Sequence, residues 1–361
     1  MAKKDQKHKS ALKEQHGIAP PKSLNPDSAK TIKLNRQKQP SVEALVSGIT
    51  TGDISALSRA ITLVESTNIA HSKKANKVIT ACLPFANKSI RIGITGVPGV
   101  GKSTFIEAFG SHLTGLGKKV AVLAVDPSSS LSRGSILGDK TRMEDLVKDK
   151  NAFIRPSPSG DSLGGVARKT RETIILCEAA GFDTIVIETV GVGQSETVVH
   201  SMVDFFLLLK LAGAGDELQG IKRGIIEMAD AIVINKADGD NLKAAKLAKI
   251  EFNRALHLYP PKASAWSPKV TLCSALMKKG ISEVWDMIEA YKAITTKNHY
   301  FEVNRNNQNK FWLLQTIEDR LKSNFYNSPK IKTELPSQIK LVESGKTTPF
   351  VAAAYLLSLT N

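Results

Sequence analysis

The feature that most constrains this chain is a glycine-rich octapeptide set between an apolar run and a helical pattern. Residues 96–103 read GVPGVGKS and match GxxxxGK[ST] at every fixed position. The apolar run 91–94 precedes the motif and the helical stretch 104–116 follows it. Glycines let successive backbone N–H groups turn toward phosphate oxygens, and the helix presents its positive end to them. The motif predicts a strand–loop–helix unit that binds a nucleoside triphosphate.

Two side chains of this loop carry the expected phosphate chemistry. Lys102 supplies a fixed cation to the β- and γ-phosphates, and the Ser103 hydroxyl can coordinate Mg²⁺. A glycine-rich turn that binds nothing is the alternative, and the complete motif in its strand–helix context argues against it. The expected phosphate cradle is Gly96, Val97, Pro98, Gly99, Val100, Gly101, Lys102, Ser103 and Thr104.

From residue 90 onward, short apolar runs alternate with helical patterns. Most of these runs are almost continuously apolar, which is typical of strands buried on both faces of a parallel sheet. The alternation predicts an α/β fold, a P-loop NTPase with a mostly parallel central sheet flanked by helices. The predicted strands are Ile90–Thr95, Val120–Asp126, Asp183–Glu188, Phe205–Leu211, Ala231–Asn235 and Lys269–Cys273.

Helical periodicity dominates on both sides of this core. Apolar residues recur at spacings of three and four over 42–64, with Asp53 as a plausible N-cap of a second helix. After about Asn304 the pattern is helical again, and a closing helix is expected over Pro349–Leu359. We therefore expect four regions: a basic disordered tail (1–40), an N-terminal helical extension (41–89), a P-loop domain (90–300) and a C-terminal helical arm (301–361). One apolar stripe of that arm comprises Phe311, Leu314, Ile317 and Leu321.

Positive charge is concentrated in the tail. The chain of 361 residues has 50 basic and 34 acidic residues, a net charge of +16, and residues 1–40 carry ten basic and three acidic ones. The tail holds four prolines and no aromatic residue that could stack on bases, so a solvated extension is favoured over a nucleic-acid-binding arm. A hydrophobic content of 42% excludes a wholly disordered chain.

Cysteine content and apolar run length bear on location. Cys82, Cys177 and Cys273 are widely separated, which excludes a disulfide scaffold or a cysteine-based zinc module and fits a cytoplasmic protein. The longest apolar run, Phe350–Leu357, is far shorter than the ~20 residues of a membrane-spanning helix. The N-terminus lacks the apolar segment of a secretory signal. We expect no membrane association.

The choice of base is indicated by the sequence Asn235-Lys236-Ala237-Asp238, which ends an apolar run. One carboxylate can accept both the N1–H and the exocyclic amine of guanine, whereas adenine would leave Asp238 partly unpaired. The motif therefore favours GTP over ATP. A further element, Ser274-Ala275-Leu276, follows the next predicted strand, where GTP-binding domains place backbone amides against the guanine carbonyl.

Carboxylates near the ends of two predicted strands are candidates for a magnesium site. Asp126 ends one strand, Asp139 lies downstream, and Glu188 ends another strand. Glu188-Thr-Val-Gly191 resembles the DxxG of other GTPases, in which the glycine amide senses the γ-phosphate. For Asp126 and Asp139, helix capping is the alternative.

Hydrolysis also requires an oriented water and a neutralising charge. Gln194 is a candidate for the first role, and Arg142, with Lys222 and Arg223, for the second.

Several longer segments carry a family resemblance. In order they read VDPSSS, SILGDKTRM, ETVGVGQSE, GAGDELQGIKRG, NKADGDN and SAL. From about residue 41 to its end the chain resembles the MeaB/ArgK family, GTPases that accompany adenosylcobalamin-dependent methylmalonyl-CoA mutase. The resemblance implies a SIMIBI-class fold, GTP and GDP as ligands, a homodimer formed through the C-terminal arm, and a third switch over Gly213–Arg223. It also implies a chaperone that gates cofactor loading and protects the mutase, with a magnesium site of Ser103, Asp126, Asp139 and Glu188.

Two departures from the family pattern lie in or near switch loops. Ser130 and Arg133 stand where relatives usually have proline and glycine, and Gly160-Asp161 interrupts a segment that relatives tend to write PSPSSGTLGG. Segment lengths are preserved, so the departures bear on nucleotide-coupled motion and client recognition rather than on the fold.

Other functions stay open at this point. An ATP-dependent kinase of an amino-acid (lysine/arginine/ornithine) transport system conflicts with Asp238. A metal-insertion GTPase for nickel enzymes would need a histidine- or cysteine-rich site, whereas the seven histidines are scattered. The client is equally open, because methylmalonyl-CoA and isobutyryl-CoA mutases use closely related partners.

Overall fold

The computed structural model describes residues 40–125, 143–156, 163–189, 195–213 and 223–360. Residues 1–41 and 42–361 form separate units, and the second is described here. Several sequence predictions lie outside the described residues: the tail, most of the third switch, the departures at 130, 133 and 160–161, and the candidates Asp126, Asp139, Arg142, Gly191, Gln194 and Lys222.

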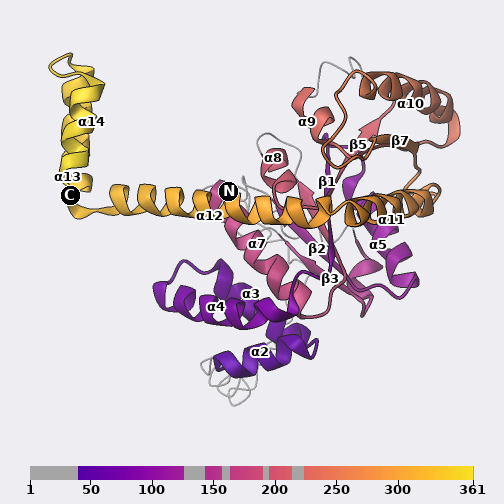
Figure 1. Ribbon diagram of the computed structural model, residues 1–361, viewed down its shortest axis with the longest axis horizontal. Coiled ribbons are helices and arrows are strands. Elements are labelled where there is room, and N and C mark those ends of the chain that lie inside the picture. The colour runs from indigo at the N-terminus through magenta and orange to yellow at the C-terminus, as the bar shows by residue number, and fades with distance from the viewer. Residues whose placement is uncertain (1–39, 126–142, 157–162, 190–194, 214–222, 361) are drawn as a thin grey trace, which may run out of the picture. The chain divides into compact units, whose positions relative to one another are not determined.

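A seven-stranded sheet occupies the centre of the described chain (Figure 1). Its spatial order is β3-β2-β4-β1-β5-β6-β7, and every neighbouring pair is parallel. The predicted α/β fold with a parallel sheet is confirmed. The strands are β1 (Ile90–Gly96), β2 (Val120–Val125), β3 (Ala152–Arg155), β4 (Thr184–Thr189), β5 (Phe205–Leu211), β6 (Ala231–Asn235) and β7 (Lys269–Leu272).

Helices cover both faces of the sheet, which is why its central strands are apolar throughout. On one face, α5 (Lys102–Gly115) and α11 (Ile281–Lys297) pack Phe105, Phe109 and Ile288 against β1 and β5. The other cluster joins α7 (Leu163–Ala179) and the N-terminal helices to β2 and β4. In a third cluster, α10 (Leu242–Leu256) packs against β6 through Ala245 and Phe252.

Strand prediction from apolar runs succeeds in the interior of the sheet and fails at its edge. All six predicted strands are present, with ends that differ by one residue at most; the second ends at Val125 and the last at Leu272. β3 was not predicted, because it has four residues with only Phe153 buried and pairs with β2 alone in the described chain.

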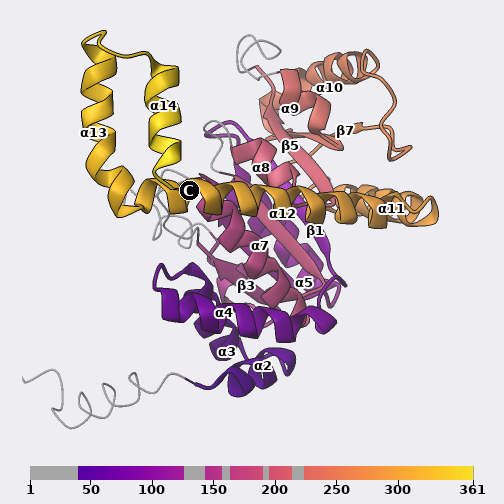
Figure 2. The same ribbon diagram turned by 60° about the vertical axis from the view of Figure 1, so that its left-hand side comes forward.

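The N-terminal helices are α2 (Val42–Thr50), α3 (Ile54–Glu65) and α4 (Ile69–Cys82). Asp53 caps α3 as expected, since its carboxylate accepts the Ser55 N–H at 2.7 Å. The C-terminal helices begin earlier than predicted, at Tyr300. They are α12 (Tyr300–Asn327), α13 (Pro329–Glu343) and α14 (Pro349–Ser358), the last two lying side by side in Figure 2.

Short helices complete the described chain: η1 (Leu83–Phe85), η2 (Leu146–Lys148), α8 (Ser195–His200), α9 (Arg223–Met228) and η3 (Gly239–Asn241). Among all helices in the described ranges, none has the length and apolar character needed to cross a bilayer.

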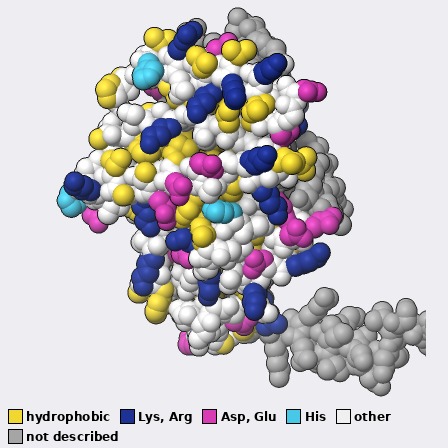
Figure 3. All heavy atoms as spheres, turned by 90° about the vertical axis from the view of Figure 1, so that its right-hand side faces the viewer, with side chains coloured by type: hydrophobic (Ala, Val, Ile, Leu, Met, Phe, Trp, Pro, Cys, Tyr) yellow, Lys and Arg dark blue, Asp and Glu magenta, His cyan; other side chains and the backbone are white. Residues whose placement is uncertain are grey.

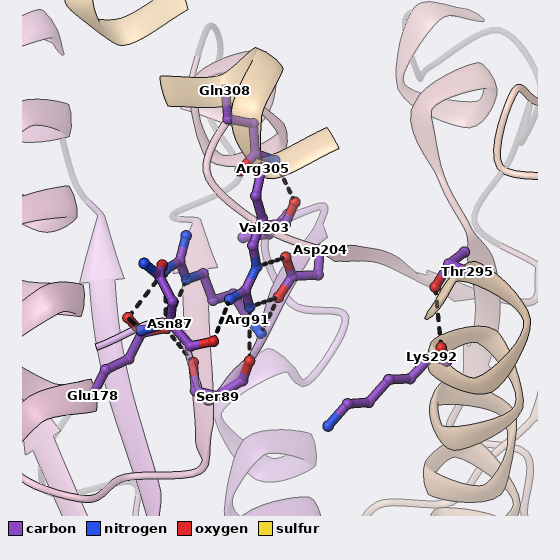
Figure 4. A network of polar contacts seen from close by, with 10 residues as sticks. All are labelled: Asn87, Ser89, Arg91, Glu178, Val203, Asp204, Lys292, Thr295, Arg305 and Gln308. Carbon is purple, nitrogen blue, oxygen red and sulfur yellow. Dashed lines mark hydrogen bonds and ion pairs between the residues drawn. The ribbon is translucent and has the colours of Figure 1, made fainter. Parts of the chain in front are cut away.

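The first half of α12 is fixed to the core by buried polar contacts (Figure 4). The Arg305 guanidinium donates to both oxygens of Asp204, at 2.8 and 2.6 Å, and to the Ser89 carbonyl at 2.7 Å. Further along the helix, Gln308 donates to the Val203 carbonyl at 2.7 Å. Beside this group, Arg91 pairs with Glu178 at 3.0 Å. The first half of α12 and the sheet with its flanking loops therefore share a buried polar network.

Candidate nucleotide-binding site

The phosphate loop connects β1 to α5 through backbone conformations that require glycine. Gly99 and Gly101 have φ angles of +82° and +90°, in the left-handed region that disfavours side chains. A Cβ on Gly101 would lie 2.9 Å from the Asn235 Nδ2, and a Cβ on Gly96 would lie 2.6 Å from the Leu209 carbonyl. The glycines of the motif therefore permit close packing of the loop against β5 and β6.

Lys102 lies within this loop. Its side chain is buried, and its ammonium donates to the Gly96 carbonyl at 2.8 Å. Val100 anchors the loop in the core and is fully buried. Val97 and Ser103 are half-buried, whereas Pro98, Gly99 and Thr104 are exposed.

Asn235 joins the phosphate loop to the loop after β7. Its side-chain amide donates to the Val100 carbonyl at 2.9 Å, and its Oδ1 accepts the Ala275 N–H at 3.1 Å. The side chain is 1% exposed, so both bonds are shielded from water. Sequence reasoning assigned Asn235 to the base alone; the contact with the phosphate loop links residues 135 positions apart and has no local signal.

Lys236 and Asp238 extend the same connection. Lys236, in the left-handed conformation with φ of +57°, donates its ammonium to the Gly99 carbonyl at 3.0 Å. The Asp238 carboxylate accepts a hydrogen bond from the Ser274 hydroxyl, which in turn accepts the Met277 N–H at 3.2 Å. Ala275 is buried and Leu276 is 77% exposed. The two predicted base-binding segments thus lie together.

Glu188 lies one strand away from the phosphate loop. β4 is the immediate neighbour of β1, and Glu188 is in register with Ile94, two residues before the loop begins. Its side chain is 7% exposed. In the same layer the Thr189 hydroxyl donates to the Thr95 hydroxyl at 2.8 Å, which ties the two strand ends together. Glu188 and Ser103 are the two described members of the expected magnesium site.

The geometry defines a P-loop GTPase, in which a guanine-type motif on β6 is bonded directly to the phosphate loop. The family model described as "Methylmalonyl Co-A mutase-associated GTPase MeaB" matches residues 57–330. The chain belongs to this family, and guanine-nucleotide binding and GTP hydrolysis follow from membership.

Named relatives cover most of the chain. It is 48% identical over 320 residues to "Probable GTPase Rv1496" of Mycobacterium tuberculosis, covering 89% of this chain and 95% of the relative. It is 48% identical over 298 residues to "GTPase ArgK" of Escherichia coli, covering 82% and 90%. The mouse "Methylmalonic aciduria type A homolog, mitochondrial" is 44% identical over 334 residues, covering 90% and 80%.

Structural comparison agrees with the sequence relatives. A crystal structure titled "LAO/AO transport system kinase" matches with a TM-score of 0.72 at 37% identity, covering 88% of this chain and 97% of that one.

Proposed function

We propose that this GTPase is a chaperone of an adenosylcobalamin-dependent methylmalonyl-CoA mutase or a closely related acyl-CoA mutase, whose cofactor loading it gates and which it protects. The observation that carries the proposal is the match to a mutase-associated GTPase family over residues 57–330. GTP hydrolysis in such a system times the release of a partner, because the γ-phosphate holds switch segments that relax once it is lost.

The nucleotide roles form part of the proposal. The backbone of residues 96–104 holds the phosphates with Lys102, while Asn235, Lys236, Asp238 and the segment Ser274–Leu276 hold guanine. The positive φ angles of Gly99 and Gly101 support the phosphate role, because they open the loop backbone toward a ligand. The Ser274–Asp238 hydrogen bond supports the base role, because it fixes the orientation of the carboxylate.

A magnesium ion fits the described part of the site. The Ser103 hydroxyl in the first turn of α5 and the Glu188 carboxylate near the end of β4, the strand beside β1, supply hard oxygen donors, the ligand type that Mg²⁺ prefers. When bound, the ion neutralises phosphate charge. We assign Asp126 and Asp139 to the same site, the Gly191 amide to the γ-phosphate, and Arg142 and Gln194 to charge neutralisation and water orientation. Glu188→Gln should weaken the Mg²⁺ dependence of GDP affinity.

A homodimer is supported by the outer part of α12. Phe311, Leu314, Ile317 and Leu321 recur at helical spacing and are 47–64% exposed. Exposed apolar rows of this kind mark protein interfaces. Beyond them, α12, α13 and α14 enclose an apolar groove of about 440 Å³ that includes Tyr326, Ile339 and Leu356. We propose that residues 301–361 form the dimerisation arm, with 41–89 as the helical extension and 90–300 as the GTPase domain.

Light scattering tests the arm. Leu314→Glu combined with Ile317→Glu should give a monomer, whereas Leu247→Glu, on the exposed face of α10 at 63% exposure, should leave the dimer intact. A dimeric double variant would contradict this role. Deleting the whole arm is a poorer test, because it would also remove the buried Arg305.

Neither nucleic acid nor a membrane is a partner in this proposal. On the face drawn in Figure 3, Lys and Arg side chains are interspersed with acidic and apolar ones instead of forming a single basic patch. The three cysteines are all free and buried, which supports a cytoplasmic location.

Co-elution tests the partner. The purified chain with a GTP analogue should co-elute with methylmalonyl-CoA mutase from the same organism on size exclusion. Absence of a complex with every nucleotide and with the related mutases would contradict the proposal. Phosphoryl transfer from ATP to a transport component would instead support the kinase alternative.

A further inference from the structure

A second cavity, besides the groove between α12, α13 and α14, lies near the amino-terminal ends of β5 and β6. The phosphate loop lies at the opposite, carboxyl-terminal end of the strands. The cavity has a volume of about 440 Å³ and is bounded by the end of α8, by α9, by α11 and by the first turn of α12. Its wall includes Asp204 and Asp230, which directly precede β5 and β6, whereas the phosphate loop follows the carboxyl end of β1. The volume falls in the range of small-molecule sites.

Two tyrosine hydroxyls belong to residues of this wall. Tyr291 is 3% exposed as a residue, and its ring packs edge-on against Phe205 and Trp266, with ring centroids at 5.0 and 5.6 Å. Within the described ranges, the hydroxyls of Tyr291 and Tyr300 form no hydrogen bond, although both residues line the cavity. Each hydroxyl is therefore available to a ligand in the cavity or to water.

The Lys262 ammonium in the wall, and Arg305 behind it, bond to groups of the protein. The Lys262 ammonium donates to the carbonyls of Met228 and Ala229 at 2.9 and 2.8 Å and to Asp230 at 2.8 Å, which uses all three of its protons. Arg305 likewise directs its guanidinium to Asp204 and to backbone carbonyls. The Lys262 ammonium, which lines the cavity, therefore has no proton left for an anionic ligand.

Negative charge, by contrast, reaches the cavity. Asp204 and Asp230 are each balanced by one cation, but Glu227 is exposed at the wall and forms no ion pair in the part of the chain that the structure describes. Burial raises the pKa of Tyr291 and of Tyr300, and the Asp230 carboxylate raises both further, so the hydroxyls stay neutral beside a negative potential. Hydroxyl oxygens, a free carboxylate and an aromatic wall are features that recognise organic cations.

We propose that this cavity binds an alkyl ammonium or alkyl guanidinium group, carried either by a free small molecule or by a lysine or arginine side chain of a partner protein. Glu227 supplies the counter-charge, and the Tyr291 and Tyr300 hydroxyls accept hydrogen bonds from the cation. An anion would meet no free lysine or arginine donor among the described residues of the wall. A purely apolar guest would leave both hydroxyls dry and unpaired.

Calorimetry of the full-length chain, kept saturated with GDP so that the phosphate loop is occupied, tests the proposal. Butylguanidinium and butylammonium are the probes, and 1-butanol and butyrate are the neutral and anionic comparisons. We expect saturable one-to-one binding of the two cations, with a Kd on the order of 1 mM for so small a probe. We expect no binding of 1-butanol or butyrate. Tyr291→Phe and Glu227→Gln should each weaken cation binding at least fivefold.

Matched controls separate this site from general charge effects. Tyr326→Phe on the arm and Glu251→Gln on the exposed side of α10 should bind the cations as the wild type does. Equal binding of butanol or butyrate, cation binding unchanged in Tyr291→Phe and Glu227→Gln, or no saturation by either cation at ten times the expected Kd would each overturn the proposal. If the cations bind, a capped Gly-Arg-Gly peptide distinguishes the two sources of the cationic group. Tighter binding of the peptide than of butylguanidinium identifies an arginine side chain of a partner protein, and weaker binding identifies a free small molecule.

Discussion

Asn235 offers a sharp test of how the nucleotide site is assembled. Its side chain makes two buried hydrogen bonds, to Val100 of the phosphate loop and to Ala275 of the loop after β7. Asn235→Ala removes both and leaves a carbonyl and an N–H without partners. At about 1–1.5 kcal/mol for each buried bond, the loss is about 2–3 kcal/mol.

That free energy should appear in nucleotide affinity, because the two loops would have to be ordered by the ligand. A loss of about 2–3 kcal/mol corresponds to a decrease of about 30- to 150-fold in GDP affinity. Titration with a fluorescent GDP analogue measures the affinity, and denaturation of the nucleotide-free chain measures any cost to the fold itself. We expect most of the cost in affinity.

One further variant separates the two bonds, and another serves as a control. Asn235→Asp keeps an acceptor for the Ala275 N–H but loses the donor to Val100, so it should lose affinity chiefly through the phosphate loop. Asn253→Ala on α10, whose side chain makes no hydrogen bond within the described residues, should leave affinity unchanged. If Asn235→Ala bound GDP within threefold of the wild type, the link between the loops would not matter to binding.

Four other outcomes are expected. Lys102→Ala should abolish GTP hydrolysis, and retained turnover in purified protein would place the phosphate site elsewhere. Asp238→Asn should weaken GTP and favour xanthosine nucleotides, because the amide donates where the carboxylate accepted; an unchanged preference in a competition assay would remove its base role. Arg305→Ala should cost about 3–5 kcal/mol in chemical denaturation, since it leaves the buried Asp204 unpaired, and a cost under about 1 kcal/mol would show that the pair is solvated. Burial lowers the pKa of His200, so the native ring stays neutral while the unfolded chain gains a proton below about pH 6.5. The free energy of unfolding should therefore fall as the pH drops below that value, by at most about 1.4 kcal/mol per pH unit. An equally steep fall in His200→Asn would refute this.

Local patterns predicted those parts of the fold that local physics decides. The phosphate loop is contiguous and carries its glycines for steric reasons that the structure displays at Gly96 and Gly101. Interior strands were found because burial on both faces makes each an unbroken apolar run. β3 was missed because a four-residue edge strand needs no such run.

The sequence did not predict the long-range polar contacts. No local pattern around Asn235 indicates its hydrogen bond to Val100. Arg305 lies in a helix whose other polar residues mostly face solvent, so the pattern gives no reason to expect it to be buried. Lys236 was predicted to bind the base. Its hydrogen bond to the Gly99 carbonyl was not predicted, because the left-handed backbone conformation of Lys236 has no sequence signal. The second cavity gathers residues from four helices, so no segment could have indicated it.

GTP hydrolysis by the purified chain, alone and with methylmalonyl-CoA mutase from the same organism, tests the central claim most directly. With ATP as the control nucleotide, we expect turnover of GTP only, and a faster rate when the mutase is added. GTP turnover that no cobalamin-dependent acyl-CoA mutase alters would contradict the chaperone function, and preferential ATP turnover would contradict the role of Asp238 as well.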